Sequence, residues 1–395
     1  PARCKQTPLL RWSPALPPNC SCGLQAEAFP LKDLPQFSVK IYWTLIYNGT
    51  ETDFLIRAMN GSQKTILVTG GAGFIGSNFI KFIHQRYPDT KILLLDALTY
   101  AGNLDNIPPS LKSNGHFKFF HGNITHPDIV NKLVSEADIV VHFAAESHVT
   151  RSIYDNAIFF ETDVIGTQVV ANAIVNNPVE LFVHISSSEV YGTALSDPMD
   201  EEHPLNPMSP YAAAKAGADR LIYSYVKTYD LPAVIIRPFN NYGPCQHLEK
   251  AIPNFIVSAL QDQPLTIHGN GQSSRDWMYV EDTCEALDRV LHTERDRVIG
   301  QTINLGTGTD TSVVEIASRI LRLLNKPESL LQFIEDRPGQ VTRHISSTEK
   351  SRECLGWKSK IDLDEGLART IEFYQNNRKW WERVMWMKEL WAPKG

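Results

Sequence analysis

The sequence lacks the features that mark several common classes of protein. Its six cysteines are scattered over 395 residues with neither a disulfide-framework nor a zinc-ligand spacing, and the pair Cys20 and Cys22 has no partner histidines. No basic block is present, and a net charge of −6 argues against nucleic acid or an anionic membrane as the main partner. No apolar run of about 18 residues is present either, so no membrane span is expected. We therefore expect a cytoplasmic protein with no metal, no nucleic acid and no membrane among its partners.

The segment Gly70–Gly76 has the spacing of a dinucleotide-binding loop and follows the apolar run 66–68. Gly70 would allow a tight turn, Gly73 a close approach of the backbone to a diphosphate, and Gly76 the packing of the following helix. About 20 residues later, Asp96 ends a second apolar run. Its carboxylate could accept hydrogen bonds from a ribose 2′-hydroxyl and would repel a 2′-phosphate, so the sequence predicts NAD rather than NADP.

Strands and helices alternate from Lys64 onward, which predicts an α/β fold with a Rossmann-type, doubly wound parallel sheet. The expected elements are strands at 65–68, 92–95, 139–143, 181–186 and 233–237, and helices from 74, near 127–136, near 156–175 and at 211–229. The pattern becomes mixed after about residue 245, with short strands at 264–268 and 301–304 among helices. Aromatic residues at helical spacing over 380–391 predict core or interface packing.

These patterns divide the chain into three parts. Residues 1–58 are rich in proline and aperiodic, do not begin with methionine, and lack the basic start and apolar core of a signal peptide. We expect them to form an N-terminal extension outside the catalytic fold. Residues 59–245 are expected to form the NAD-binding Rossmann domain. Residues 246–395 are expected to form a smaller, mainly substrate-binding mixed α/β domain, some of whose elements return to the first.

Tyr211 and Lys215 stand four residues apart at the start of a predicted helix, so they share one helix face. A free phenol is a poor base at neutral pH, because its pKa is near 10. A neighbouring ammonium and a positively charged nicotinamide would both favour the phenolate. Tyr211 could then take a proton from a sugar or alcohol hydroxyl while hydride passes to NAD.

A serine-rich turn follows the predicted strand 181–186 and carries one carboxylate. Ser186, Ser187 and Ser188 precede Glu189 there. Open α/β sheets bind ligands at the carboxyl ends of their strands, so these hydroxyls and this carboxylate are candidates for substrate chemistry.

By these motifs, the chain resembles the extended short-chain dehydrogenases/reductases, and within them the dTDP-glucose 4,6-dehydratases. Further segments that carry the resemblance are 98–104, 142–148, 151–153, 240–244, 249–253, 275–277, 279–282, 336–339 and 355–357. The stretches 99–104 and 249–253 point to the dehydratases rather than to the superfamily at large. The resemblance covers residues 64–376 and implies a homodimer whose contacts include the helix of Tyr211.

The resemblance implies a nucleoside-diphosphate hexose as substrate, with dTDP-glucose first. Tyr211 would deprotonate the C4 hydroxyl as hydride leaves for NAD⁺, while Ser187 hydrogen-bonds that oxygen. Glu189 would remove the C5 proton, water would leave from C6, and hydride would return to C6. Cofactor contacts are implied for Gly70, Gly73, Phe74, Ile75, Gly76, Asp96, Asn123, Ile124, Ala144, Ala145, Tyr211 and Lys215, and substrate contacts for Ser147, His148, Asn241, Glu249, Lys250, Arg275, Asn304 and Arg337.

Several positions depart from the pattern of that family. Ser188 stands where the dehydratases have the aspartic acid that would protonate the C6 hydroxyl. A serine is too weak an acid for this, so either it orders a water, or Glu189 handles both proton transfers, or no elimination occurs. Thr150 and Asn123 replace Asp, and Gln340 replaces His, which leaves the base and the sugar open.

Alternative functions remain open on the sequence. A Ser-Glu pair at this place also resembles GDP-mannose 4,6-dehydratases and UDP-glucuronate decarboxylases. A UDP-sugar 4,6-dehydratase, a 4-epimerase or a decarboxylase would use the same C4 oxidation, and Arg275 could bind the C6 carboxylate in the last case. A regulatory protein that only binds a nucleotide sugar is the non-enzymatic alternative.

Overall fold

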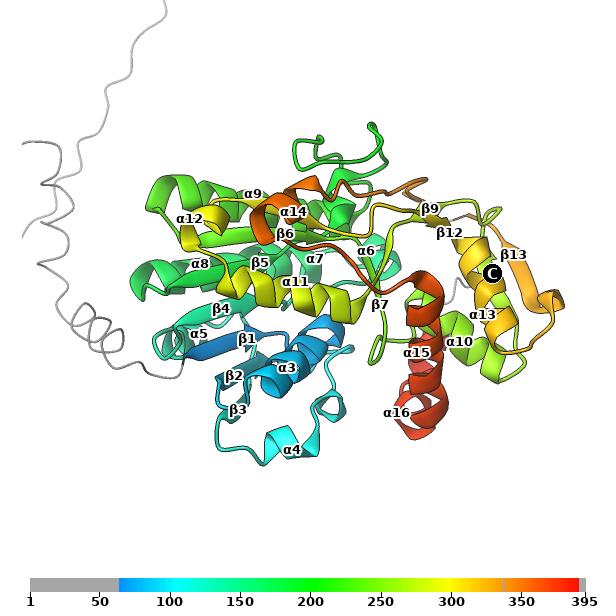
Figure 1. The fold of residues 1–395 in the computed structure, drawn as a ribbon, viewed down its shortest axis with the longest axis horizontal. Helices are drawn as coiled ribbons and strands as arrows, with labels where there is room; N and C mark the ends of the chain where they lie inside the picture. Colours follow the sequence, from blue (N-terminus) through cyan, green and yellow to red (C-terminus); the bar gives the residue numbers. More distant parts are fainter. Residues whose placement is uncertain (1–63, 337, 391–395) are drawn as a thin grey trace, which may run out of the picture. The chain divides into compact units, whose positions relative to one another are not determined.

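A seven-stranded parallel sheet forms the centre of the molecule (Figure 1). The computed structural model describes residues 64–336 and 338–390, all within one compact unit. The sheet order is β3-β2-β1-β4-β5-β6-β11, and every neighbouring pair is parallel. Its strands are β1 (Thr65–Thr69), β2 (Lys91–Asp96), β3 (Phe117–His121), β4 (Ile139–His142), β5 (Leu181–Ile185), β6 (Ala233–Pro238) and β11 (Thr302–Leu305). The predicted Rossmann-type fold is confirmed, and the strand order reverses between β1 and β4, where such sheets bind ligands.

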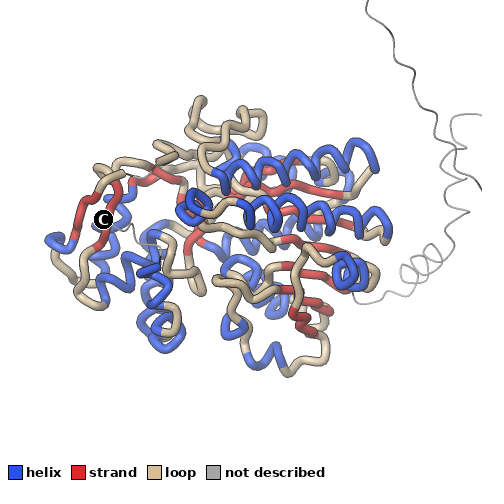
Figure 2. The backbone as a smooth tube through the Cα atoms, turned by 180° about the vertical axis from the view of Figure 1, so that it is seen from behind, coloured by secondary structure: helices blue, strands red, loops and turns tan. Residues whose placement is uncertain are grey.

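Helices cover both faces of the sheet (Figures 1 and 2). The α3 (Phe74–Arg86) and α11 (Val280–His292) helices pack on one face, while α5 (Pro127–Val134), α8 (Thr167–Asn176) and α9 (Pro210–Tyr229) pack on the other. Neighbouring residues of a strand point to opposite faces, so a strand in the middle of the sheet, such as β1, is buried along its whole length.

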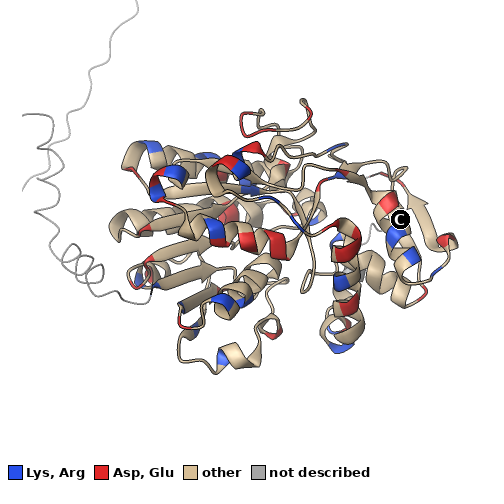
Figure 3. Ribbon diagram, in the orientation of Figure 1, with Lys and Arg blue, Asp and Glu red and all other residues tan. Residues whose placement is uncertain are grey.

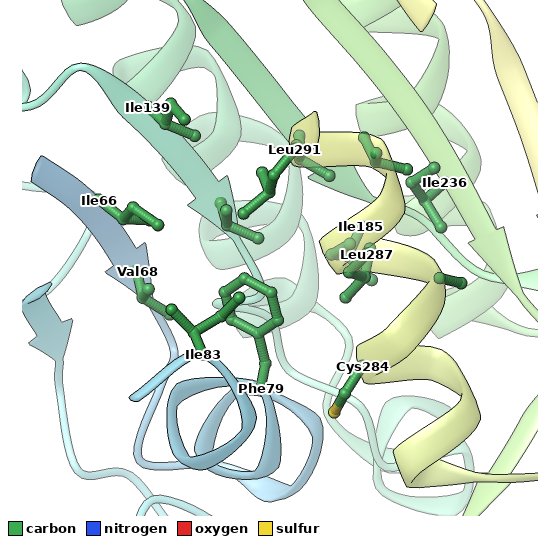
Figure 4. Close-up of a cluster of buried hydrophobic side chains, with 14 of the residues drawn as sticks. Ile66, Val68, Phe79, Ile83, Ile139, Ile185, Ile236, Cys284, Leu287 and Leu291 are labelled. Atoms are coloured by element: carbon green, nitrogen blue, oxygen red, sulfur yellow. The ribbon is translucent and has the colours of Figure 1, made fainter. Parts of the chain in front are cut away.

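The core on the α3 and α11 side shows this packing directly (Figure 4). Ile66 and Val68 of β1 contribute to it, whereas Leu67 between them belongs to the core on the other face. Phe79 of α3 and Leu287 of α11 meet these strand residues, and each of the two side chains is 1% exposed. The side chains of β1 thereby pack against helices on both faces of the sheet.

The remaining elements build a smaller layer at one end of the sheet, with its own core. Three two-stranded pairs belong to it, β7–β10, β8–β13 and β9–β12. Its strands and helices are β7 (Asn240–Tyr242), β8 (Leu265–His268), β9 (Ser274–Arg275), β10 (Trp277–Tyr279), β12 (Thr311–Ser312), β13 (Leu331–Ile334), α10 (Ala251–Leu260), α13 (Val313–Leu323), α15 (Leu363–Asn376), α16 (Arg378–Glu382) and α17 (Met385–Leu390). Trp381 is 2% exposed in this core, as predicted for the aromatic run, whereas Trp386 of the same run is 57% exposed.

Short helices join the other elements. They are α4 (Pro109–Lys112), α6 (Val149–Tyr154), α7 (Ala157–Phe159), α12 (Arg295–Val298) and α14 (Glu349–Leu355), with 3-10 turns at Leu104–Asn106, Ser188–Tyr191 and Glu328–Leu330. The predicted helix near 156–175 is not uniform, because a π-helical turn, Phe160–Gly166, separates α7 from α8. Such turns displace side chains from regular helical positions and often occur at functional sites.

The segment Ala157–Asn176 bears on the expectation that no membrane span is present. It is long and apolar enough to cross a membrane by length and composition, although 44% of its most apolar window is buried inside the protein. Val170 and Ile174 on its buried side belong to the core between the sheet and the helices. The apolar composition of this helix is therefore accounted for by packing on the sheet.

Two expectations fall outside the described residues. The proposed N-terminal extension, residues 1–58, is one, and Arg337 is the other. The strand β3 was missed by the sequence reading, because only Phe117, Phe119 and Phe120 are partly covered at this edge of the sheet and no residue of the strand is fully buried.

Truncating a core side chain of α11 should destabilise the fold. We expect Leu287→Ala to lower the free energy of unfolding by about 2–5 kcal/mol, since the cavity it leaves is enclosed by sheet and α3. Arg289→Ala on the exposed side of the same helix should change it by less than about 0.5 kcal/mol. Urea unfolding followed by circular dichroism measures both variants. An equal decrease in the free energy of unfolding of both variants would show that Leu287 contributes no more to stability than an exposed residue of α11.

Candidate active site

One cavity of about 820 Å³ joins the two layers of the protein. It begins at the carboxyl ends of β1, β2, β4 and β5 and extends to β9 and α10. Such a volume suits a cofactor with a substrate. The cavity is lined by these residues from the sequence analysis: Gly70, Gly73, Phe74, Ile75, Gly76, Asp96, Asn123, Ile124, Ala144, Ala145, Ser147, His148, Ser187, Ser188, Glu189, Tyr211, Lys215, Asn241, Glu249, Lys250 and Arg275.

The glycine loop leaves room that any larger residue would fill. Gly70 has a φ of +69°, and a Cβ atom there would lie 2.5 Å from the backbone nitrogen of Ala144. A Cβ on Gly76 would lie 2.6 Å from the carbonyl oxygen of Gly70. The α3 helix starts at Phe74 with Gly73 as its N-cap and no side chain capping it, so its N-terminal N–H groups face the cavity. This cradle fits the diphosphate of a dinucleotide.

Asp96 closes the same end of the cavity. Its Oδ2 accepts from the backbone N–H of Ala72 at 2.9 Å and its Oδ1 from that of Leu98 at 2.8 Å. Burial raises the pKa of this carboxyl, and the two N–H groups oppose that shift. Each carboxylate oxygen keeps a second lone pair, so Asp96 can still accept from ribose hydroxyls.

Tyr211 and Lys215 lie one turn apart on α9, which starts at Pro210 after the capping residue Ser209. Burial raises the pKa of Tyr211 well above its ordinary value, and a hydrogen bond with Ser187 lowers it in part. The ammonium of Lys215 donates to the carbonyl of Ile185 at 2.7 Å, and burial lowers its pKa. The phenol is therefore protonated at neutral pH until positive charge is brought next to it.

The turn after β5 presents Glu189 to the same cavity. Ser187 caps the 3-10 turn by accepting from the N–H of Glu189 at 3.2 Å. Ser188 is 2% exposed, and its hydroxyl lies 3.5 Å from Nδ1 of His344, which is fully buried behind it. The fold thus brings the turn after β5, with Ser187 and Glu189, to the same cavity as Tyr211 of α9.

A buried ion pair joins β6 to α9 beneath this turn. Nε and Nη2 of Arg237 each donate to a carboxylate oxygen of Asp219 at 2.9 Å. Asp219 also accepts from the hydroxyl of Ser186 at 2.7 Å, and Nη1 of Arg237 donates to the phenol oxygen of Tyr191 at 2.8 Å. Although burial favours the neutral acid, the two hydrogen bonds and the charge of Arg237 hold the pKa of Asp219 well below its usual range.

Glu249 is the centre of a polar cluster at the far end of the cavity. It accepts from the hydroxyl of Tyr100 at 3.0 Å and pairs with the ammonium of Lys250 at 3.1 Å. Nε2 of His148 lies 3.5 Å from its second oxygen. Burial alone would raise the pKa of Glu249, but Lys250, His148 and His247 outweigh it and hold that pKa below its usual range. The buried charge of Glu249 is thus compensated by its neighbours in the cavity.

Asn304 does not line the cavity. Its side chain accepts from the hydroxyl of Tyr191 at 2.7 Å and donates to the carbonyl of Met199 at 3.2 Å, and it is fully buried. Asn241 does line the cavity, although its amide already donates to Phe239 and accepts from Thr283. The structure therefore places Asn304 behind the site, as a support for Tyr191.

Several residues of the site were missed by the sequence reading. Asp163 is 1% exposed in the π-helical turn, accepts from the N–H of Glu146 at 2.7 Å, and interacts electrostatically with Lys215. Tyr100 and His247 line the cavity, whereas His344 lies behind it. Tyr100 could have been found within the stretch 98–104. No local motif marks Asp163, His247 or His344, because they lie in a helix interior or in loops.

The described ranges 64–336 and 338–390 contain no group of three or more His, Cys, Asp or Glu residues that could hold a metal ion.

Comparisons with known proteins agree with this geometry. A family model described as GDP-mannose 4,6 dehydratase matches residues 67–370. The low-salt glycan biosynthesis protein Agl12 of Haloferax volcanii is 43% identical over 309 residues, which are 78% of this chain and 98% of that protein. The dTDP-glucose 4,6-dehydratase of Streptomyces niveus is 40% identical over 321 residues, 80% of this chain and 94% of that enzyme.

Solved structures give the same assignment. DesIV, a dTDP-glucose 4,6-dehydratase from Streptomyces venezuelae solved with NAD and TYD bound, superimposes with a TM-score of 0.77 at 38% identity. The match covers 81% of this chain and 99% of DesIV. The chain therefore belongs to the GDP-mannose 4,6-dehydratase family of extended short-chain dehydrogenases/reductases.

Proposed function

We propose that the protein is an NAD-dependent nucleotide-sugar 4,6-dehydratase that converts dTDP-glucose to the dTDP-4-keto-6-deoxy sugar. One observation carries this proposal: a single cavity joins the dinucleotide cradle, the phenol of Tyr211 and the carboxylate of Glu189. The family membership and the dehydratases among its relatives support the same activity.

The oxidation uses the residues of α9 and the turn after β5. When bound, NAD⁺ would accept hydride from C4, return it at C6 and bring positive charge beside Tyr211. Tyr211 takes the proton of the C4 hydroxyl. Ser187 hydrogen-bonds the phenol of Tyr211 and orients the C4 oxygen of the sugar. Lys215, anchored on Ile185, stabilises the phenolate through its charge. The cofactor contacts are Gly70, Gly73, Phe74, Ile75, Gly76, Asp96, Asn123, Ile124, Ala144 and Ala145.

The elimination depends on Glu189. A C4 carbonyl makes the C5 proton acidic, and Glu189 faces the same cavity with a carboxylate that can take it. A 4-epimerase needs no such base. A UDP-glucuronate decarboxylase would instead need a cation for the C6 carboxylate, and Arg275 is the candidate. Ser147, His148, Asn241, Glu249, Lys250 and Arg275 bind the sugar diphosphate in our proposal, with Arg337 from outside the described residues.

We also propose a cytoplasmic homodimer that contacts neither nucleic acid nor membrane. Cys245, Cys284 and Cys354, the described cysteines, are free thiols, as expected in a reducing compartment. Basic and acidic residues alternate over the helices in Figure 3 without a basic face in that view.

An apolar surface near α8 and α9 is formed by Phe160, Ile165 and Tyr223, whose exposed fractions are 42–50%. A second copy of the chain could cover it. The domain division at residue 245 remains part of this proposal.

The identity of the reaction can be tested by product mass. The purified protein is incubated separately with dTDP-glucose, UDP-glucose, GDP-mannose and UDP-glucuronate, and the products are analysed by mass spectrometry. Loss of one water from dTDP-glucose is expected. An unchanged mass with a changed sugar configuration would indicate epimerisation, and loss of carbon dioxide would indicate decarboxylation. Either result, or no reaction with any of the four sugars, would contradict the proposal.

The cofactor should remain bound during the reaction, because hydride is returned. NAD is expected to copurify and to appear in the supernatant of heat-denatured protein. Gly76→Ala should lose it, since the added methyl lies 2.6 Å from a backbone oxygen of the cradle. Gly115→Ala is the matched control, because no atom lies within 4 Å of its Cβ. Retention of NAD by Gly76→Ala would exclude this loop as the diphosphate site.

Glu189→Gln should separate oxidation from elimination. The amide has nearly the same size but cannot take the C5 proton, so product formation should fall by about 10²–10⁴-fold. Bound NAD and binding of the dTDP-sugar, measured by calorimetry, should be retained. Unchanged turnover would remove Glu189 from the mechanism. A wild-type protein that binds the sugar without any turnover would support the regulatory alternative.

A further inference from the structure

One nitrogen of a buried imidazole faces both proton-handling groups of the turn after β5. Nδ1 of His344 lies 3.5 Å from the hydroxyl of Ser188 and 3.9 Å from a carboxylate oxygen of Glu189. Ser188 and Glu189 line the cavity, whereas His344 is fully buried behind them. Contacts of this length in a ligand-free site commonly shorten when substrate binds.

The other nitrogen of His344 fixes the tautomer. Nε2 lies 2.6 Å from the carbonyl oxygen of Gly192, so Nε2 carries the hydrogen and Nδ1 the lone pair. Gly192 has a φ of +69°, and a Cβ there would lie 2.1 Å from the carbonyl oxygen of Asn206, so a larger residue at this position would displace the carbonyl that holds Nε2. The ring of Phe239 contacts the imidazole edge-on at 6.0 Å. Nδ1 is thereby held toward Ser188 and Glu189 as a proton acceptor.

The electrostatic surroundings keep this imidazole neutral at rest. Burial lowers the pKa of His344, Glu189 raises it, and Arg275 and His203 lower it further. A neutral imidazole beside a carboxyl group that has just gained a proton is ready to accept that proton. Bulk water has little access here, since Ser188 is 2% exposed and His344 not at all.

We propose that His344 carries the proton taken from C5 by Glu189 to the hydroxyl of Ser188, which protonates the departing C6 oxygen. The inference rests on the proposed dehydration and explains how that reaction proceeds with serine at position 188. His344 touches no reacting atom and acts through its two neighbours, so it is a positioning residue. Ser188 is the catalytic residue that donates to the leaving group.

The proton count closes within the site. The electrons of the C5–H bond form the C5–C6 double bond, the C6–O bond breaks, and its electron pair leaves on oxygen. Glu189 passes the C5 proton to Nδ1 of His344, Nδ1 passes a proton to Ser188, and Ser188 gives its own proton to the C6 oxygen, which departs as water. Glu189, His344 and Ser188 then regain their starting states. The proton that Tyr211 took from the C4 hydroxyl balances the one that C5 gains when hydride returns to C6.

The test is His344→Gln, whose side-chain amide can keep the hydrogen bond to Gly192 but cannot carry a proton. Oxidation at C4 should continue while elimination slows by about 100-fold or more. Rapid mixing with dTDP-glucose should therefore accumulate reduced nicotinamide, seen by its near-ultraviolet absorbance. The 4-keto sugar that still carries its C6 hydroxyl should accumulate with it, seen by quench and mass spectrometry as a loss of two hydrogens. Ser188→Ala should give the same accumulation with a smaller disturbance of packing, so it serves if His344→Gln does not fold.

Rescue distinguishes proton transfer from a structural role. Ser188→Asp supplies a carboxylic acid next to the leaving oxygen, so it should maintain turnover alone and restore it in the His344→Gln background. His292→Gln is the control: it removes an imidazole of α11 that pairs with Asp288 and packs on Tyr87, away from Ser188 and Glu189. It should cause no accumulation of reduced cofactor.

The outcomes separate the two proposals. If His344→Gln eliminates water at the wild-type rate, the proposed proton transfer through His344 is overturned and the dehydratase assignment stays intact. The same holds for Ser188→Ala if His344→Gln does not fold. Failure of Ser188→Asp to restore elimination in a folded, NAD-containing His344→Gln protein also overturns this proton transfer. A wild-type protein that dehydrates none of the tested sugars overturns the proton transfer and the proposed function together.

Discussion

The buried ion pair between Arg237 and Asp219 determines where the reacting groups of this site meet. Asp219 lies one helical turn beyond Lys215 on α9, and its carboxylate also holds the hydroxyl of Ser186 at the end of β5. Arg237 reaches from β6 to Tyr191, which ends the turn that carries Glu189. Removing Asp219 would leave Arg237 as an uncompensated buried charge, at a typical cost of about 3–5 kcal/mol. The pair therefore links α9, which carries Tyr211, to the turn after β5, which carries Glu189.

Burial gives the site its electrostatic character. Desolvation raises the pKa of Tyr211 and lowers those of Lys215 and His344, so each of these groups is pushed toward its neutral form. Glu249 is held ionised in spite of burial by the cations and imidazoles around it. A site of this kind responds strongly to added charge, because few water molecules can screen it. A positively charged nicotinamide and a diphosphate are the ligands that would change its protonation most.

The sequence predicted the first strand, the glycine loop and the helix from Phe74 closely, because local rules fix all three. Glycine is required where a Cβ atom would strike backbone, and the apolar run before the loop has the length of a strand buried on both faces. The edge strand Phe117–His121 escaped prediction, since no residue in it is fully buried. The helix over 156–175 was expected to be regular, but it contains a π-helical turn in which Asp163 is buried and interacts electrostatically with Lys215. No sequence periodicity signals that turn.

By itself the sequence determined the fold class, the cofactor loop, and the candidate groups Tyr211, Lys215 and Glu189, because each depends on neighbours within a few positions of the chain. It also marked Ser188 as the place where an acid is missing. Only the tertiary structure decided that Asn304 supports Tyr191 from behind the cavity and that His344 stands next to Ser188, 156 positions away along the chain. Such contacts arise from strand order and crossovers, which bring distant segments to one sheet edge without leaving a local pattern in the residues themselves.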